Sequence, residues 1–162
     1  MLRLTLVRHA KSSWDDPALG DFDRPLNGRG RRDAPLMAKR LASEPLGPVR
    51  LVSSPAVRAL ATAHAFAEVL GVPEKQVRVE PNVYDAEADT LLGIVHGLDD
   101  ADRHVLLFGH NPGLSELAAA LAPHDIGELP TCAVLTLRFE STHWRTIGQA
   151  STVERYLVPK KE

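Results

Sequence analysis

The sequence predicts a three-layer α/β/α domain built on a mostly parallel central sheet. Three short apolar segments, Leu2–Val7, Val49–Ser53 and Val105–Phe108, are rich in Leu and Val and are bounded by Arg, Pro or Gly. Runs of this kind are typical of strands that are buried on both faces of a parallel sheet. Segments with helical spacing lie between them, and alternation of strands with helices indicates βαβ units. Because 162 residues is the size of one domain, we expect residues 1–162 to form a single domain.

Four helices are expected from the spacing of apolar residues and from start and stop signals. Asn27 is a candidate cap for the first helix, although Pro35 must then kink that helix or mark its true start. Ser54-Pro55 and Asn111-Pro112 each offer a capping side chain followed by proline, and Gly71 is a natural stop. The expected helices cover about 27–41, 54–71, 88–98 and 111–121.

Two further strands are expected near the C-terminus. Ala133–Phe139 alternates as a strand does, and Trp144–Ala150 is predicted to pair with it through the turn at Glu140–His143. Cys132 is the single cysteine, so it has no partner for an internal disulfide or a thiolate metal site. We interpret it as a small buried residue of the strand Cys132–Leu137 rather than as a nucleophile.

The composition is that of an ordinary folded protein. Hydrophobic residues make up 44% and charged residues 25% of the chain, which excludes a disordered protein. The net charge of -2 predicts no general attraction to nucleic acid or to an anionic membrane. No apolar run approaches the ~18 residues of a membrane span, and Met1–Arg8 is too short and too charged for a signal segment. We therefore expect a cytoplasmic monomer that binds neither nucleic acid nor membrane.

Cationic side chains follow each of the three predicted parallel strands. Arg8 and His9 come at the end of the first strand. Arg58 lies one turn into the helix after the second strand, and His110 follows the third. Because ligands of such sheets bind beyond the carboxyl ends of the strands, we expect these four side chains to converge there. Arginine forks and the N-termini of helices suit the oxygens of a phosphoryl group, which would offset their mutual repulsion.

A histidine in such a pocket can act as a nucleophile towards phosphorus. The neutral ring has a lone pair on one nitrogen, and its attack gives a phosphohistidine that water later hydrolyses. The other ring nitrogen must be protonated and held, usually by a backbone carbonyl. Surrounding cations stabilise the charge on the phosphoryl oxygens, and a carboxylic acid would protonate the leaving group.

Four motifs that contain these residues occur in order along residues 4–120. They are Leu6-Val7-Arg8-His9-Ala10, Asp23-Arg24-Pro25-Leu26-Asn27-Gly28-Arg29-Gly30, Ser53-Ser54-Pro55-Ala56-Val57-Arg58-Ala59 and Gly109-His110-Asn111-Pro112. Together they resemble the motifs of the histidine phosphatase superfamily, which has the phosphoglycerate mutase-like fold. The variant Arg8-His9-Ala10-Lys11-Ser12 in a compact chain looks like the SixA branch of that superfamily.

This resemblance implies a role for each matching residue. His9 would be the nucleophile of a hydrolysis that needs neither metal nor cofactor. Members of the SixA branch are described as phosphatases of phosphohistidine on histidine-containing phosphotransfer domains, which would be the partner of this protein. The implied phosphate contacts are Arg8, Arg58 and His110, with Lys11 and Ser12 as further candidates in the first loop.

The general acid is the point at which the chain departs from the pattern. Larger relatives carry a Glu or Asp on an insertion between the second Arg and the second His. Here the stretch from Arg58 to His110 already holds a helix, a strand and another helix, which leaves little room for a capping insertion. Asp85 lies nearest the expected place, with Glu87 as its substitute. A phosphohistidine has a good leaving group, so the weak acid signal fits that substrate.

Two neighbouring positions have competing interpretations. Arg8 is expected to bind phosphate, and the alternative is an ion pair with Asp23 or Asp85. Trp14 follows the first motif and either lines the mouth of the site or packs against the loop.

Three functions are compatible with these motifs. The leading one is a phosphatase that uses His9 and removes phosphate from phosphohistidine on a phosphotransfer protein. The alternative is a broad phosphomonoesterase that acts on small phosphorylated metabolites, since an open site suits either substrate. A non-catalytic phosphate-binding module is the third, and the presence of His9 argues against it.

Overall fold

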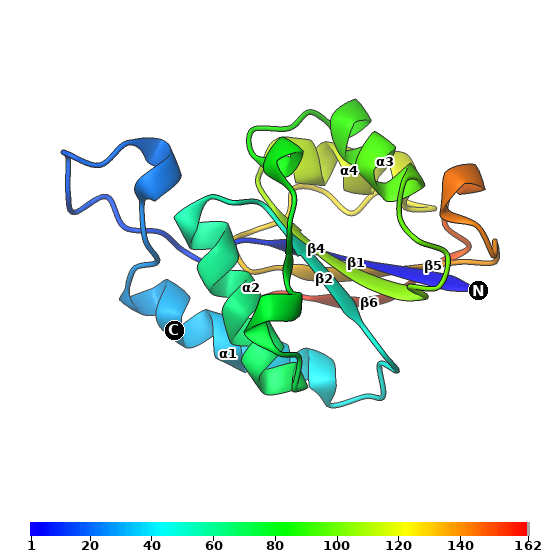
Figure 1. The fold of residues 1–162 in the computed structure, drawn as a ribbon, viewed down its shortest axis with the longest axis horizontal. Coiled ribbons are helices and arrows are strands. Elements are labelled where there is room, and N and C mark those ends of the chain that lie inside the picture. Colours follow the sequence, from blue (N-terminus) through cyan, green and yellow to red (C-terminus); the bar gives the residue numbers. More distant parts are fainter. Residues whose placement is uncertain (162) are drawn as a thin grey trace.

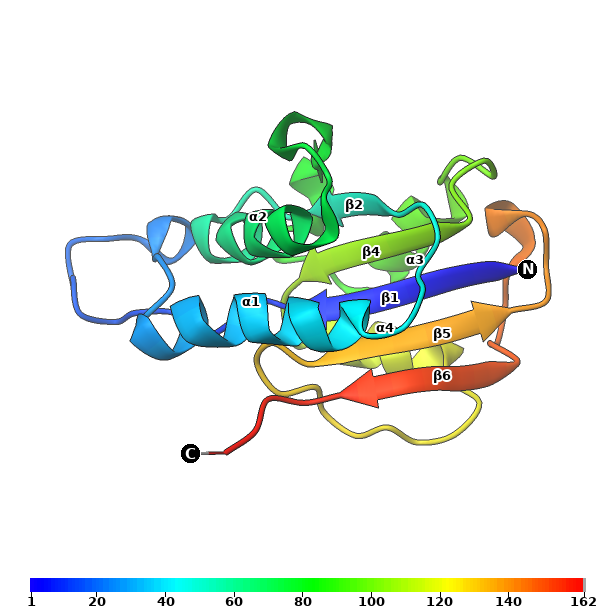
Figure 2. The same cartoon turned by 90° about the horizontal axis from the view of Figure 1, so that it is seen from below.

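A six-stranded sheet runs through the middle of the protein, and the computed structural model describes residues 1–161 (Figure 1). The strand order is β3-β2-β4-β1-β5-β6, as Figure 2 shows for the strands that it labels. The four strands β3, β2, β4 and β1 are parallel, whereas β5 is antiparallel to both β1 and β6. The strands are β1 Leu2–Arg8, β2 Arg50–Ser53, β3 Arg78–Val79, β4 His104–Gly109, β5 Val134–Phe139 and β6 Thr152–Leu157.

Helices cover both faces of this sheet, which confirms the predicted three-layer α/β/α domain. α1 (Gly28–Ala42) and α2 (Val57–Leu70) lie together on one face. α3 (Ala88–His96) and α4 (Gly113–Leu121) lie on the other (Figure 1). Each face has its own apolar core, because successive side chains of a strand point to opposite sides.

The central strand β1 shows how the sequence supplies both cores. Leu2, Leu4 and Leu6 are fully buried in the core beneath α3 and α4. Val7 is also fully buried but belongs to the core beneath α1 and α2. Burial on both faces explains why the strand reads as a continuous apolar run rather than as an alternation.

The helix boundaries follow the predicted signals with three differences. α4 begins at Gly113 with Pro112 as its N-cap, one residue later than the Asn111-Pro112 signal predicts. Asn27 caps α1, since its side-chain oxygen accepts a hydrogen bond from the Gly30 N–H, and the helix runs past Pro35 rather than starting there. α2 starts at Val57, two residues later than the Ser54-Pro55 signal predicts, and Gly71 ends it in the left-handed conformation. The Ser54 hydroxyl accepts from the N–H of Ala56, so it stabilises the turn before the helix.

The prediction of a strand at Trp144–Ala150 is wrong. Trp144–Thr146 forms a single 3-10 turn, and the strand that pairs with β5 is β6, which begins at Thr152. The Trp144 ring is fully buried, and its indole N–H donates to the carbonyl of Asp102. Filling the core with this ring requires a turn, and that requirement outweighs the strand propensity of the local sequence.

The prediction of a strand from Cys132 needs a smaller correction. β5 starts at Val134, and Cys132 lies in the preceding turn with a positive φ of 60°. The side chain is fully buried as expected, and burial raises the pKa of the thiol to about 12, with a further contribution from Asp33. Such a thiol stays protonated, so it does not serve as a nucleophile.

The connection between α2 and β4 contains no capping domain. Residues 71–103 hold the 3-10 turns η2 (Glu74–Gln76) and η3 (Pro81–Val83), the two-residue strand β3 and α3. The carboxyl ends of the strands are therefore left uncovered from this direction. Among residues 1–161, no helix combines the length and the apolar character needed to cross a membrane.

Candidate active site

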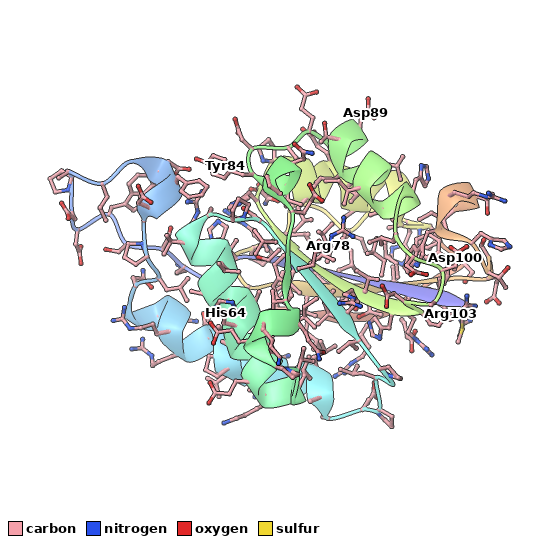
Figure 3. The ribbon with its side chains drawn as sticks, viewed as in Figure 1. His64, Arg78, Tyr84, Asp89, Asp100 and Arg103 are labelled. Carbon is pink, nitrogen blue, oxygen red and sulfur yellow. The ribbon has the colours of Figure 1, made fainter. Side chains whose placement is uncertain are left out.

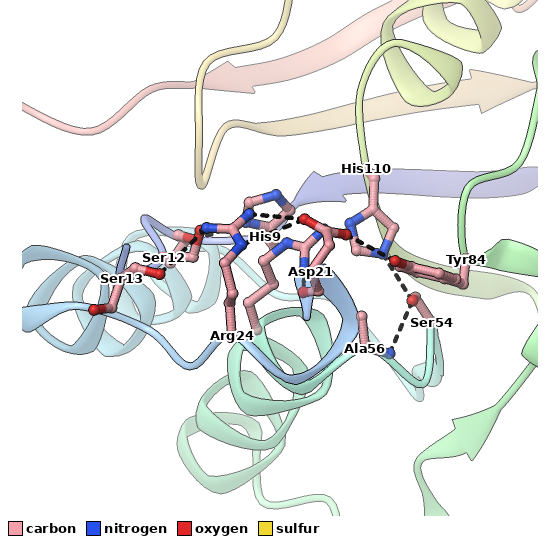
Figure 4. A network of polar contacts seen from close by, with 11 residues as sticks. His9, Ser12, Ser13, Asp21, Arg24, Ser54, Ala56, Tyr84 and His110 are labelled. Atoms are coloured by element: carbon pink, nitrogen blue, oxygen red, sulfur yellow. Dashed lines mark hydrogen bonds and ion pairs between the residues drawn. The ribbon is translucent and has the colours of Figure 1, made fainter. Parts of the chain in front are cut away.

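The carboxyl ends of β1, β2 and β4 open into a cavity of about 800 Å³. The strand order makes these three strands neighbours, so the segments that follow them meet at one edge of the sheet. Arg8, His9, Arg58 and His110 all line this cavity, as the sequence predicts. Figure 4 shows His9 and His110 within a network of polar contacts that joins them to the surrounding loops.

His9 follows β1 and is held with a defined tautomer. Its Nδ1 lies 2.7 Å from the carbonyl oxygen of Ala10, so Nδ1 carries the proton and donates it. The lone pair is then on Nε2, which is the atom that can attack phosphorus. Burial lowers the pKa of His9 to about 4, against the hydrogen bond to Ala10 and with help from the positive charge of Arg58. The ring is therefore neutral at physiological pH, as a nucleophile must be.

His110 follows β4 and is held from the β2 side. Its Nε2 lies 2.7 Å from the Ser54 hydroxyl, and its ring centroid lies 5.3 Å from that of His9. Burial, together with the neighbouring His9 and Arg58, lowers the pKa of His110 to about 3. If the Ser54 hydroxyl donates to Nε2, the proton of the neutral ring is on Nδ1, where it can be given to an anion.

The pocket residues leave several buried donors unused. Within residues 1–161, four buried side-chain nitrogen or oxygen atoms have no hydrogen-bond partner, and three of them are Arg8 Nε, Arg58 Nε and His110 Nδ1. Orphaned buried donors are costly, and they concentrate where a ligand completes the hydrogen bonding. Three donors of this kind on three neighbouring segments suit the oxygens of a tetrahedral anion.

Arg8 lines the cavity, and no acid among residues 1–161 forms an ion pair with it. Its Nη1 donates to the carbonyl of Leu129 at 2.9 Å, and burial lowers the pKa of the guanidinium. Within residues 1–161, neither Asp23 nor Asp85 forms an ion pair with it. Its positive charge thus stays available to a bound anion.

The loop between β1 and α1 forms a second wall, centred on Arg24. Arg24 is buried, and its Nη1 donates to the Ser12 hydroxyl at 2.7 Å. Ser12 and Lys11 both line the cavity, but the Ser12 hydroxyl already accepts this bond. The Trp14 ring lies 3.5 Å from the Arg24 guanidinium, lines the cavity and is 76% exposed, so it lies at the mouth of the site.

Asp21 occupies the middle of this network. Its carboxylate accepts from Arg58 Nη2 at 3.0 Å, from Arg24 Nη2 at 3.1 Å and from the Tyr84 hydroxyl at 2.7 Å. Arg58 Nη1 also donates to the Asp21 carbonyl at 2.6 Å. Burial alone would raise the pKa of Asp21, but the hydrogen bonds from Tyr84, Arg58 and Arg24 outweigh it and lower the pKa to about 2. The same bond from Tyr84 raises the pKa of its phenol.

The two candidate acids lie in different places. Asp85 lines the cavity beside Tyr84 and has a positive φ of 55°. Glu87 precedes α3 and lines a neighbouring hollow instead. Of the two, Asp85 is therefore the one placed to reach a group bound near His9.

Four residues of the site have no role predicted from the sequence: Asp21, Arg24, Tyr84 and Ser54. Arg24 and Ser54 are inside the quoted motifs, so their motif positions were an available signal. Asp21 had no such signal, because several aspartates occur in the same loop and only the fold shows which one meets Arg58. Figure 3 shows Tyr84 on the segment before α3, facing the loop that carries Asp21.

Comparison with known sequences identifies relatives over most of the chain. Residues 4–96 match the histidine phosphatase superfamily (branch 1). An uncharacterised chloroplast protein of Arabidopsis thaliana is 35% identical over 150 residues, which are 88% of this chain and 68% of that protein. An uncharacterised protein of Mycobacterium tuberculosis is 30% identical over 152 residues, which are 87% of this chain and 91% of that protein.

Solved structures show the same architecture. A candidate phosphohistidine phosphatase SixA from Agrobacterium tumefaciens is 27% identical and superposes with a TM-score of 0.79, covering 98% of this chain and 99% of that one. The protein histidine phosphatase SixA complexed with tungstate is 25% identical with a TM-score of 0.77, covering 88% of this chain and 92% of that one. The match over residues 4–96 shows that this chain belongs to the histidine phosphatase superfamily.

Proposed function

We propose that this phosphatase removes the phosphoryl group from phosphohistidine on a phosphotransfer protein, with His9 as the nucleophile. The observation that carries the proposal is the state of His9 itself. Its Nδ1 is fixed by the Ala10 carbonyl, its pKa is lowered to about 4, and Nε2 is left with a lone pair inside a cationic cavity.

The first chemical step follows from this geometry. The Nε2 lone pair of His9 attacks phosphorus, a bond forms between them, and the bond to the leaving group breaks. Arg8, Arg58 and His110 would hold the three phosphoryl oxygens, and their charge and N–H groups stabilise the transition state. Their unused buried donors are in place before the substrate binds, so little reorganisation is needed.

The second step frees the enzyme. Water attacks the phosphorus of phosphorylated His9, the P–N bond breaks, and its electron pair returns to Nε2. The proton stays on Nδ1 throughout, hydrogen-bonded to the Ala10 carbonyl, so the ring leaves as neutral imidazole and not as an anion. No separate acid is needed for the departure of His9.

The architecture and the relatives favour a protein-borne phosphohistidine. The connection from α2 to β4 carries no capping domain, so a bulky phosphoprotein can approach the cavity. The two similar SixA structures are named as phosphatases of phosphohistidine or of protein histidine, and one of them holds tungstate, an oxyanion that resembles phosphate. A good imidazole leaving group also removes the need for a strong general acid.

One experiment separates the two enzymatic functions. Hydrolysis rates are measured side by side, at neutral pH with a chelator, for a phosphohistidine-bearing phosphotransfer domain and for p-nitrophenyl phosphate. A preference for the phosphoprotein by several orders of magnitude is expected. Comparable rates would instead establish a general phosphomonoesterase. His9→Gln serves as the inactive control, and His64→Gln, on the partly exposed face of α2, controls for the loss of any histidine.

A second candidate, phosphomonoester hydrolysis, is favoured by one relative. Phosphoserine phosphatase 1 of Hydrogenobacter thermophilus is 33% identical over 100 residues, covering 60% of this chain and 41% of that protein. In this case a phosphoserine leaving group would need a proton, and Asp85 is the carboxyl group that lines the cavity without an ion pair in residues 1–161.

A further inference from the structure

We propose that Asp21 is a specificity-determining residue that favours P–N substrates over phosphate esters, because its carboxylate accepts the N–H of a phosphorylated imidazole. The inference rests on the proposed chemistry at His9 but not on a protein substrate. It assigns Asp21 to the leaving group, whereas Arg8, Arg58 and His110 hold the phosphoryl group.

The position of Asp21 supports this assignment. The residue lines the cavity and is bonded to Arg58, which also faces the phosphoryl site. Four donors already meet the carboxylate, Arg24 Nε and Nη2 at Oδ1 and Arg58 Nη2 and Tyr84 at Oδ2. The side chain keeps 51% of its surface exposed, so a further N–H can approach it from the solvent side and share one of these oxygens. Tyr84, which donates to Asp21, packs edge-on against His110 at 5.5 Å between ring centroids. These contacts place the carboxylate beside the residues that would hold the phosphoryl group, which is where we place the leaving group.

Hydrogen bonds hold both the backbone and the carboxylate of Asp21 in place before a substrate binds. The Asp21 carbonyl accepts from Arg58 Nη1, and its carboxylate is held by Arg24, Arg58 and Tyr84. Arg24 is in turn anchored to Ser12 and stacked on Trp14. A carboxylate in such a network loses little entropy when it accepts one more hydrogen bond.

The charge of Asp21 discriminates between leaving groups. Surrounded by two guanidinium groups and a phenol donor, Asp21 remains a carboxylate over the whole working pH range, so it cannot supply a proton to an alkoxide. It can, however, accept the N–H of an imidazole ring and stabilise its positive charge, as carboxylates do for histidine in many sites. An anionic leaving oxygen is repelled by this carboxylate.

The reaction balances with this role. The phosphorylated imidazole enters with a proton on its distal nitrogen, hydrogen-bonded to Asp21. His9 Nε2 forms a bond to phosphorus, the P–N bond of the substrate breaks, and its electron pair goes to the substrate nitrogen. The ring leaves as neutral imidazole that keeps its distal N–H. Without that proton it would have to leave as imidazolate, which is a far poorer leaving group.

The test compares two small substrates in one variant. Phosphoimidazole contains the P–N bond, and p-nitrophenyl phosphate has a leaving group that needs no proton. In Asp21→Asn, kcat/KM for phosphoimidazole should fall by about 50-fold or more, while the aryl phosphate should lose only about 3- to 5-fold as Arg58 and Arg24 lose an anchor. The ratio of the two substrates should therefore fall at least about tenfold.

The pH profile supplies a second readout that a purely structural role would not move. Asp21 favours the protonated ring, so the decline of phosphoimidazole hydrolysis with rising pH should begin about one pH unit lower in Asp21→Asn than in the parent. The matched control is Asp23→Asn, two residues away in the same 3-10 turn and exposed, which should leave both the ratio and the profile unchanged.

Two results would overturn the proposal. Equal losses on both substrates would make Asp21 only a support for the arginines, and an unshifted pH profile would remove its contact with the leaving group. Failure of the proposed function looks different: a phosphotransfer domain would not be hydrolysed, while the dependence of the small-substrate ratio on Asp21 would persist.

Discussion

Two walls of one cavity use arginine in opposite ways. On the wall formed by the strand ends, the partly buried Arg8 keeps its Nε without a partner, and the buried Arg58 does the same. On the loop wall, Arg24 places its donors on Ser12, Ser13 and Asp21, and its guanidinium also stacks against a ring. Buried donors thus stay without partners on one side, whereas on the other side the arginine donors already have them.

This difference separates the groups that await a ligand from the groups that build the site. A donor held without a partner stabilises an anion when one arrives, whereas a saturated guanidinium stabilises the loop that carries it. Arg58 belongs partly to both walls, because its Nη atoms hold Asp21 while its Nε stays open. Removing residues from each wall should therefore give different kinds of loss.

The largest effect is expected at His9, the proposed nucleophile. His9→Ala should reduce turnover by at least about 10⁴-fold, because no other group forms the bond to phosphorus. The melting temperature should stay close to that of the parent, since His9 lies at a strand end rather than in either apolar core. Rapid quenching followed by intact-mass measurement should also show a phosphoryl adduct in the parent and none in the variant. Activity within tenfold of the parent would contradict the assignment.

The next effect tests the open wall. Arg58→Ala should lower kcat by about 10²- to 10³-fold, which is typical for the loss of one donor to a developing oxyanion. Arg58→Lys should recover little of this, because an ammonium group cannot reproduce a planar fork. Arg78→Ala, at an exposed arginine of β3 (Figure 3), is the control and should keep full activity. A large rescue by lysine would show that charge alone matters at this position.

The strand-end wall was predictable because local signals and topology agree. Each of the four residues lies at the end of an apolar run or, like Arg58, in the first turn of the helix after it, and parallel neighbours bring these segments to one edge. The one wrong strand, Trp144–Ala150, failed for a tertiary reason, since the Trp144 ring is needed in the core. Gly30 is a second example of a tertiary requirement. A Cβ at this position would clash with the Lys11 carbonyl, so only glycine fits, and the motif shows the glycine without showing this contact.

Protonation of His9 and His110 should also destabilise the strand-end wall. In the fold, the pKa values of His9 and His110 are lowered to about 4 and about 3, below about 6.5 in the unfolded chain. Between these limits the unfolded chain binds more protons, so the free energy of unfolding should fall as pH drops from about 6.5 towards 4. Urea denaturation at pH 7, 6 and 5 measures this slope.

A double variant, His9→Gln with His110→Asn, identifies the source of that slope. Its stability should depend less on pH over the same range, because two of the groups that resist protonation are gone. Burial also lowers the pKa of His104, so this residue should keep part of the slope in the variant. Parallel curves for parent and variant would contradict the prediction.

Substitution of Arg24 on the loop wall should lower the free energy of unfolding and the order of the loop more than it lowers kcat. Arg24→Ala removes bonds to Ser12 and Asp21, which should cost about 1–3 kcal/mol in free energy of unfolding. Amide hydrogen exchange should become faster across residues 12–24 and stay unchanged in the strands. Lys39→Ala, on the exposed face of α1, is the control. A loss of kcat as large as in Arg58→Ala, without a change in exchange, would place Arg24 among the phosphate ligands instead.

The loop wall was less predictable than the strand ends for a physical reason. Its residues act through contacts with distant elements, since Asp21 meets Arg58 of α2 and Tyr84 of the segment before α3. Nothing in the spacing of the loop distinguishes Asp21 from Asp15, Asp16 or Asp23. A sequence motif indicates where the backbone turns. It does not indicate which side chains of distant elements form hydrogen bonds, because those contacts depend on how the elements pack.

The smallest effect on the proposed substrate is expected at Asp85. The residue lines the cavity between the two walls, and its role depends on the leaving group. For phosphohistidine, whose imidazole leaves without help from an acid, Asp85→Asn should change kcat by less than about threefold. For phenyl phosphate, whose leaving group needs a proton, the loss should reach about 10²-fold. Glu87→Gln, in the neighbouring hollow, should affect neither substrate. Equal sensitivity of both substrates to Asp85→Asn would show that Asp85 shapes the pocket rather than donates a proton, and the ester activity would then need another acid.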